Sequence, residues 1–190
     1  MPDRRNEGGF PSRGLSGDTL TTDDIFNQFA AQIRNGSAWP QSPRSATLTV
    51  MAALHACCTV PGAPYPRKLY YKGCRESYSQ EFMLDFCCMD AKSNEILLAA
   101  ESEWSAKAGD VEDDFQKLVY TKARFKIMIF GTDPRSVFER ATNFLRLYPC
   151  NNLGDMYIFA HISNDGAVRG WKLKIDRDGP LSSDISPILI

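Results

Sequence analysis

The sequence lacks most of the motifs that mark common functional sites. Only two histidines occur, and neither His55 nor His161 stands at an H-x₃-H or H-E-x-x-H spacing, so a histidine-rich zinc site is not indicated. Neither a P-loop nor a G-x-G-x-x-G motif is present, which leaves nucleotide-dependent chemistry without support. The formal net charge is −1, so any nucleic acid would have to be bound by a local basic patch.

Disulfide and membrane signals are also missing. There is no C-x-x-C among the six cysteines, and four of them form the adjacent pairs Cys57–Cys58 and Cys87–Cys88 inside apolar runs. We therefore expect reduced, buried thiols in a cytoplasmic protein, although a nucleophilic Cys57 or Cys58 with His161 stays an open alternative. No apolar stretch approaches the ~18 residues of a membrane span, so no membrane partner is expected.

The chain is long enough for one domain with a sizeable core. Residues 1–20 are rich in Gly, Ser, Arg and Pro and predict a flexible tail, followed by a single α/β domain over 21–190. Periodicity and end signals predict helices over 21–36, 46–60, 110–123 and 133–149, although the frequent Thr and Val of 46–60 are also compatible with a strand. They predict strands over 68–74, 81–90, 95–104, 124–132, 155–163 and 166–176, in a mixed sheet with helices on both faces.

Acidic residues gather in the hairpin predicted over 81–104. Side chains alternate along a strand, so Glu101 and Glu103 share one face, and a turn near Ser93 would place Asp85 opposite Glu101. Carboxylates held so close repel one another, and burial adds to the cost. A divalent cation would neutralise them, and Mg²⁺ prefers such hard oxygen ligands. Alternatively, Glu101 and Glu103 mark where the strand emerges into solvent, and Asp85 pairs with a nearby Arg or Lys side chain.

These acids carry a resemblance to a known family. Asp85, followed 16 residues later by Glu101-Ser102-Glu103, resembles the motif of the PD-(D/E)xK nuclease superfamily, whose restriction-endonuclease-like fold places Asp on its second core strand and (D/E)-x-K on its third. The order of elements over about 44–160 is similar as well. Leu84 stands where the family name has Pro, and Glu103 replaces the Lys, which in some members lies on the following helix. Lys117 is the candidate for that displaced Lys.

The resemblance implies the function and the roles of the site residues. Asp85 and Glu101 would bind Mg²⁺, with Mn²⁺ as a substitute and the Ala100 carbonyl as a further ligand. Glu103 would orient or deprotonate water, and Lys117 would meet the phosphate. From the residues alone, Lys117 could equally be a solvated helix residue paired with Asp113 or Asp114. The implied activity is Mg²⁺-dependent phosphodiester hydrolysis in nucleic acid.

A basic and aromatic segment gives the best local patch for a phosphate backbone. It contains Arg67, Lys68, Lys72 and Arg75, interleaved with Tyr70 and Tyr71. DNA is favoured over RNA as the nucleic acid. The alternative is an amphipathic edge strand whose lysines discourage edge-to-edge pairing. Basic residues of the later strands, including Lys126 and Lys174, are expected on solvated strand faces. The substitution of Lys by Glu103 also keeps open a catalytically weak or inactive nuclease-fold protein that binds a protein partner and acts as a regulatory module.

Overall fold

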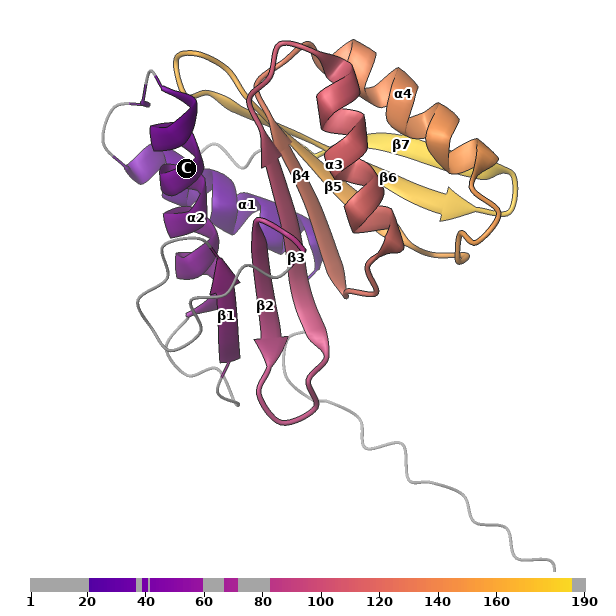
Figure 1. Cartoon of the computed structure of the whole chain (residues 1–190), viewed down its shortest axis with the longest axis horizontal. Coiled ribbons are helices and arrows are strands. Elements are labelled where there is room, and N and C mark those ends of the chain that lie inside the picture. The colour runs from indigo at the N-terminus through magenta and orange to yellow at the C-terminus, as the bar shows by residue number, and fades with distance from the viewer. Residues whose placement is uncertain (1–20, 37–38, 41, 60–66, 72–82, 186–190) are drawn as a thin grey trace, which may run out of the picture.

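The computed structural model describes residues 21–36, 39–40, 42–59, 67–71 and 83–185 (Figure 1). This part of the chain contains four helices and one seven-stranded sheet, so the prediction of an α/β fold is confirmed. The helices are α1 (Thr22–Asn35), α2 (Pro43–Cys58), α3 (Ala108–Tyr120) and α4 (Pro134–Leu147). The strands are β1 (Arg67–Tyr71), β2 (Phe86–Asp90), β3 (Ile96–Glu103), β4 (Phe125–Phe130), β5 (Met156–Ile162), β6 (Val168–Asp176) and β7 (Gly179–Ile185).

The sheet is mixed and follows the order of the chain, from β1 at one edge to β7 at the other. Strands β3, β4 and β5 run parallel in its centre, and antiparallel strands continue it on both sides. Parallel neighbours need crossover connections, and here α3 connects β3 to β4 while α4 connects β4 to β5. The central strands are therefore covered by helices, as their nearly unbroken apolar sequences predict.

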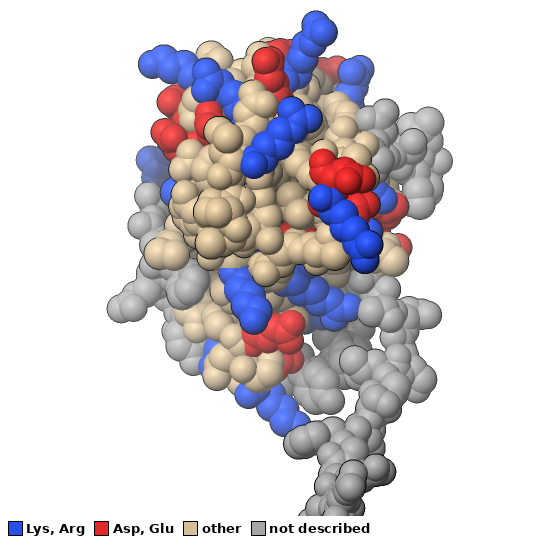
Figure 2. All heavy atoms as spheres, turned by 90° about the vertical axis from the view of Figure 1, so that its right-hand side faces the viewer, with Lys and Arg blue, Asp and Glu red and all other residues tan. Residues whose placement is uncertain are grey.

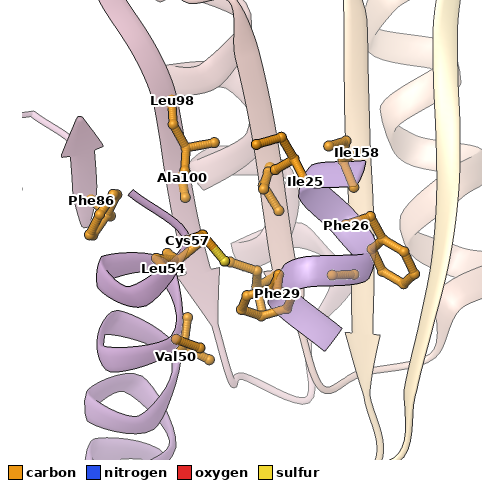
Figure 3. Close-up of a cluster of buried hydrophobic side chains, with 14 of the residues drawn as sticks. Ile25, Phe26, Phe29, Val50, Leu54, Cys57, Phe86, Leu98, Ala100 and Ile158 are labelled. Carbon is orange, nitrogen blue, oxygen red and sulfur yellow. The ribbon is translucent and has the colours of Figure 1, made fainter. Parts of the chain in front are cut away.

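Two hydrophobic cores lie on opposite faces of the sheet. Helices α1 and α2 cover one face, where Phe26, Phe29 and Leu54 pack against Ala100 and Ile158 (Figure 3). Helices α3 and α4 cover the other face, where their apolar side chains pack against Ala99, Met128 and Phe159. Because strand side chains alternate, odd and even positions of each central strand contribute to different cores.

Local signals start α1 and α4 at the predicted places. Thr21 and Asp24 form a capping box at the start of α1, and Asp133 followed by Pro caps α4. The five apolar residues that recur at helical spacing in α1 are all buried: Ile25, Phe26, Phe29, Ala30 and Ile33. Helix α2 begins three residues before its predicted start, because Ser42 caps it and Pro43 opens it.

Three features of the sheet differ from the predictions. Strand β2 begins only at Phe86, because residues 83–85 form a bend. Strand β7 was not predicted, and its Pro180 is tolerated because β7 is an edge strand. Lys126, expected on a solvated strand face, is 4 % exposed, because both faces of β4 are covered. The tail predicted over 1–20 lies outside the described residues.

The contact between α1 and β6 depends on the absence of a side chain at Gly170. A Cβ atom there would lie 2.3 Å from Cζ of Phe26, which is fully buried and cannot move aside. We expect Gly170→Ala to lower the free energy of unfolding by about 1–3 kcal/mol. Gly109 in α3 is the matched control, because a Cβ there would meet nothing within 4 Å. Urea denaturation of both variants tests this, and an unchanged midpoint for Gly170→Ala would contradict the packing.

Candidate functional site

The pairing of β2 with β3 brings Asp85 next to the acidic end of β3. Phe86 pairs with Ala100 and Cys87 with Ala99, which is the register predicted from the sequence. Asp85 itself precedes the first pair of this ladder, because residues 83–85 form a bend. The backbone N–H and the Oγ of Ser102 each donate a hydrogen bond of 2.9 Å to Oδ2 of Asp85. This contact holds the Asp85 carboxylate at the end of β3 although the residue itself precedes β2.

Glu101 is a buried carboxylate without a hydrogen bond to its Oε1 atom. It follows Ala99 on the face covered by α3, and the residue is only 1 % exposed. Oε1 has no hydrogen-bond partner among the described residues, and Nζ of Lys117 lies 3.6 Å away. Burial, and then the negative charge of Asp85, raise the pKa of Glu101 to about 8, although Lys117 opposes the rise. Without a further cation, the fold therefore favours the protonated carboxyl group at neutral pH.

Lys117 is held between Glu101 and Asp114. It belongs to the last turn of α3, and its Nζ donates a hydrogen bond of 2.6 Å to Oδ1 of Asp114. Partial burial opposes its charge, but the bond to Asp114 and the charge of Glu101 raise its pKa overall. Its side chain is 44 % exposed, so the ammonium group can still be reached from solvent. Both readings of Lys117 from the sequence are therefore present: the pair with Asp114 and the position beside Glu101.

Glu103 shares the face of Glu101 but points its carboxylate toward the following loop. Oε1 of Glu103 accepts a hydrogen bond of 2.6 Å from the backbone N–H of Ser105. Oγ of Ser105 in turn donates to Asp110 in the first turn of α3. The groups whose charges act on Glu101 are Asp85, Lys117 and Asp114. Asp114, rather than Glu103, is therefore the third acidic side chain of this cluster.

The described part of the basic segment makes contacts within the protein. Arg67 donates to the carbonyl oxygen of Cys58 at 2.8 Å, and Lys68 donates to Oδ1 of Asn94 at 3.1 Å. Arg67 pairs with Asp90, at the far end of β2 from Asp85, which is roughly 16 Å away at ~3.3 Å per residue. Lys72 and Arg75, also predicted to bind nucleic acid, lie outside the described residues. Arg67 and Lys68 thus stand in an edge strand, away from the carboxylates.

The sheet separates the thiols from His161. Cys57 belongs to the core under α1 and α2, together with Ala160 and Ile162 of β5. His161 lies between those two residues and faces the opposite way, where its ring contacts Phe130. Burial raises the pKa of Cys57 to about 12, and a hydrogen bond with Cys88, aided by burial, raises that of Cys58. Neither thiol is placed as a nucleophile activated by this histidine.

Two members of the cluster were not assigned to it from the sequence. Asp114 was expected only as a possible partner of Lys117, three residues away on the same helix face. Ser102 lies between Glu101 and Glu103 in the sequence, and the alternation of side chains along the strand would place its side chain on the opposite face of the sheet. Its contact with Asp85 arises because residues 83–85 leave the strand before β2 begins. Only the second of these features had no signal in the sequence.

Comparison of the chain with protein-family models, with curated proteins and with solved structures finds no match. None of the helices in the described residues is long and apolar enough to cross a membrane. The residues of the cluster therefore have to be interpreted from their own geometry.

The buried Glu101 makes stability depend on pH in a defined direction. Its carboxyl group titrates near 4.5 ordinarily and near 8 in the fold, so the folded state binds the proton more strongly. The free energy of unfolding should therefore decrease as the pH rises from about 4.5 to about 8, by up to about 1.4 kcal/mol per pH unit. Glu101→Gln cannot ionise and should lose this dependence. Urea denaturation at about pH 5 and about pH 8, with a chelator present, measures the difference.

Glu103→Gln is the control for this measurement and should keep the dependence of the wild type, because its carboxylate is held at the loop. Equal loss of stability between the two pH values in the wild type and in Glu101→Gln would show that Glu101 is not the group responsible.

Proposed function

We propose that the cluster of Asp85, Glu101 and Lys117 binds Mg²⁺ and hydrolyses phosphodiester bonds in nucleic acid. The observation that carries the proposal is the Oε1 atom of Glu101, which is buried beside a second carboxylate and lacks a hydrogen-bond partner among the described residues. A buried polar atom of this kind costs free energy unless a ligand satisfies it. A divalent cation is the ligand that suits two adjacent carboxylates.

The donor set fits Mg²⁺. This ion is commonly bound by one or two carboxylates and keeps several waters. Oδ2 of Asp85 accepts the bonds from Ser102, no other described residue is bound to its Oδ1, and Glu101 offers Oε1. Among the described residues, no group of three or more acidic, His or Cys side chains is placed to hold an ion. Water and the Ala100 carbonyl would therefore complete the ligands.

Each residue has a role that follows from its position. A cation held by Asp85 and Glu101 would supply stabilisation for negative charge that develops on a phosphate. Lys117, partly exposed at 3.6 Å from Glu101, would approach the same phosphate oxygens and stabilise their charge. Asp114 holds the Lys117 ammonium group in place. Glu103 would orient water with the oxygen that Ser105 does not use.

The topology supports the proposal further. Asp85 directly precedes the second strand, Glu101 stands on the neighbouring third strand, and the Lys that is missing at position 103 has a counterpart on the helix that follows. Both features are those that the resemblance to the PD-(D/E)xK nucleases implies. A restriction-endonuclease-like fold is thus part of the proposal, as is a nucleic-acid partner, with DNA favoured.

A second candidate function is a binding or regulatory module with weak or no catalytic activity. Two observations favour it: the ammonium group of Lys117 already forms a short hydrogen bond with Asp114, and Glu103 is bound to the loop. The charged groups of Arg67 and Lys68 also form hydrogen bonds within the protein. In this case the protein would keep the fold and the carboxylates but bind a protein partner.

Calorimetric titration of Mn²⁺ and Mg²⁺ into the wild type and Glu101→Gln tests the metal site. We expect millimolar or tighter binding by the wild type and a loss of at least about tenfold in the variant. Because the cation competes with a proton at Glu101, the affinity should increase with pH up to about 8 and then level off. Nuclease assays on DNA and RNA with each metal follow.

Glu103→Gln should keep metal binding, whereas Lys117→Met should keep it and lose hydrolysis by about 100-fold or more. Metal binding without hydrolysis of any substrate would favour the regulatory module. Equal binding, or none, by the wild type and Glu101→Gln would remove the metal site altogether.

A further inference from the structure

A large cavity lies away from the carboxylate cluster. It has a volume of about 1010 Å³ and is formed by the turn between β2 and β3, the end of α3, the start of β4 and the segment after α4. Neither Asp85, Glu101 nor Lys117 lines it. This volume is at the upper end of the range of small-molecule sites, which is about 300–1,000 Å³. The residues used below are Tyr120, Lys122, Arg124, Lys126, Tyr148 and Asp155.

Lys126 brings a buried ammonium group to this cavity. The residue is 4 % exposed, and its Nζ lies 4.0 Å from Oδ2 of Asp155, which is longer than a hydrogen bond. The same Asp155 oxygen accepts bonds from the backbone and side chain of Asn152. Nζ also lies 4.8 Å from the centre of the Tyr157 ring. An ammonium group has three protons to donate, and these contacts with described residues satisfy few of them.

Tyr157, whose ring lies beside Lys126, also lacks a hydrogen bond: its hydroxyl group is buried and has no hydrogen-bond partner among the described residues. Burial lowers the pKa of Lys126, and the charge of Asp155 only partly offsets this effect. Buried polar groups are normally satisfied. An anion in the cavity could accept hydrogen bonds from Lys126 and restore the balance of charge.

Aromatic side chains line the same cavity as the basic side chains. The rings of Tyr120 and Tyr148 lie 5.5 Å apart, and Phe144 stacks behind Tyr148 at 5.7 Å. Tyr120 is 57 % exposed, so part of its ring is available for contact. Aromatic side chains of this kind stack on flat rings, including bases.

Basic side chains also exceed acidic ones around the cavity. Lys122, Arg124 and Lys126 line it against Glu95 and Asp155. Figure 2 shows basic side chains next to acidic ones where the broad upper part of the molecule narrows toward its lower part. The excess of positive charge favours an anionic ligand.

We propose that this cavity binds a nucleotide, with the phosphate monoester on Lys126 and the flat ring against Tyr120 and Tyr148. The ligand could be a free nucleotide or the 5′-phosphorylated end of a strand, which share this chemistry. The site is separate from the carboxylate cluster and does not depend on the proposed nuclease activity. It also needs no P-loop, because a buried lysine takes the place of backbone N–H groups.

Calorimetric titration with adenosine 5′-monophosphate, adenosine and inorganic phosphate tests the assignment. We expect the nucleotide to bind more tightly than either of its parts. Lys126→Met, which fills a similar volume without the charge, should weaken binding by at least about tenfold. Lys174→Met is the matched control, because Lys174 is an exposed lysine of β6 outside the cavity, and it should bind like the wild type. A 5′-phosphorylated oligonucleotide that binds more tightly than the mononucleotide would identify the strand end as the ligand.

Tyr120→Ala keeps the test decisive if Lys126→Met does not fold. Tyr120 is exposed, so the variant should fold, lose about fivefold in affinity for the nucleotide and keep its affinity for phosphate. Absence of nucleotide binding by the wild type would overturn the proposal. So would equal affinities in the wild type and a folded Lys126→Met, or in the wild type and Tyr120→Ala.

Discussion

The parallel pairing of β3 with β4 inside a doubly covered sheet is the constraint on which the rest of the structure depends. Ala99, Ala100 and Glu101 of β3 pair with Lys126, Ile127 and Met128 of β4. Because helices cover both faces, alternate residues of these strands enter one core or the other. Glu101 and Lys126 fall on the face under α3 and α4, and neither can turn toward solvent without a shift of the whole register.

Two buried ionisable groups, one acidic and one basic, therefore lie on this face. Glu101 stands near the carboxyl end of β3, and Lys126 at the amino end of β4. Their charges are only partly compensated, by Lys117 at 3.6 Å and by Asp155 at 4.0 Å. A buried charged group whose ion pairs and hydrogen bonds are complete has little affinity for a further ion. A buried group whose partners are incomplete keeps such an affinity. The cation proposed at one position and the anion proposed at the other would each compensate the same kind of deficit.

Helix α3 links these two regions. Its last turn carries Lys117, which meets Glu101, and it ends at Tyr120, which lines the cavity near Lys126. The apolar side of the helix, including Phe115 and Leu118, is fixed in the core against β4 and β5. The position of both polar residues is thus set by packing that involves neither of them directly.

Local rules made much of this fold predictable from the sequence. Capping residues and apolar periodicity located α1 and α4, periodicity located the starts of α2 and α3 to within three residues, and the turn near Ser93 gave the register of β2 and β3. The presence of Asp85, Glu101 and Lys117 in one site could also be anticipated, through a family resemblance rather than through spacing alone. Such signals act over a few residues or across one hairpin, where alternation and helical periodicity hold.

Only the tertiary structure decided which charges are buried and what surrounds them. The sequence by itself determined the strand that contains Lys126, but the helices packed over it decided that this lysine is enclosed rather than solvated. Likewise, the bend before β2 brought Asp85 to Ser102, and the docking of α3 brought Asp114 toward Glu101. The reason is that burial depends on contacts between segments distant in the chain, and no local pattern encodes the distance between them.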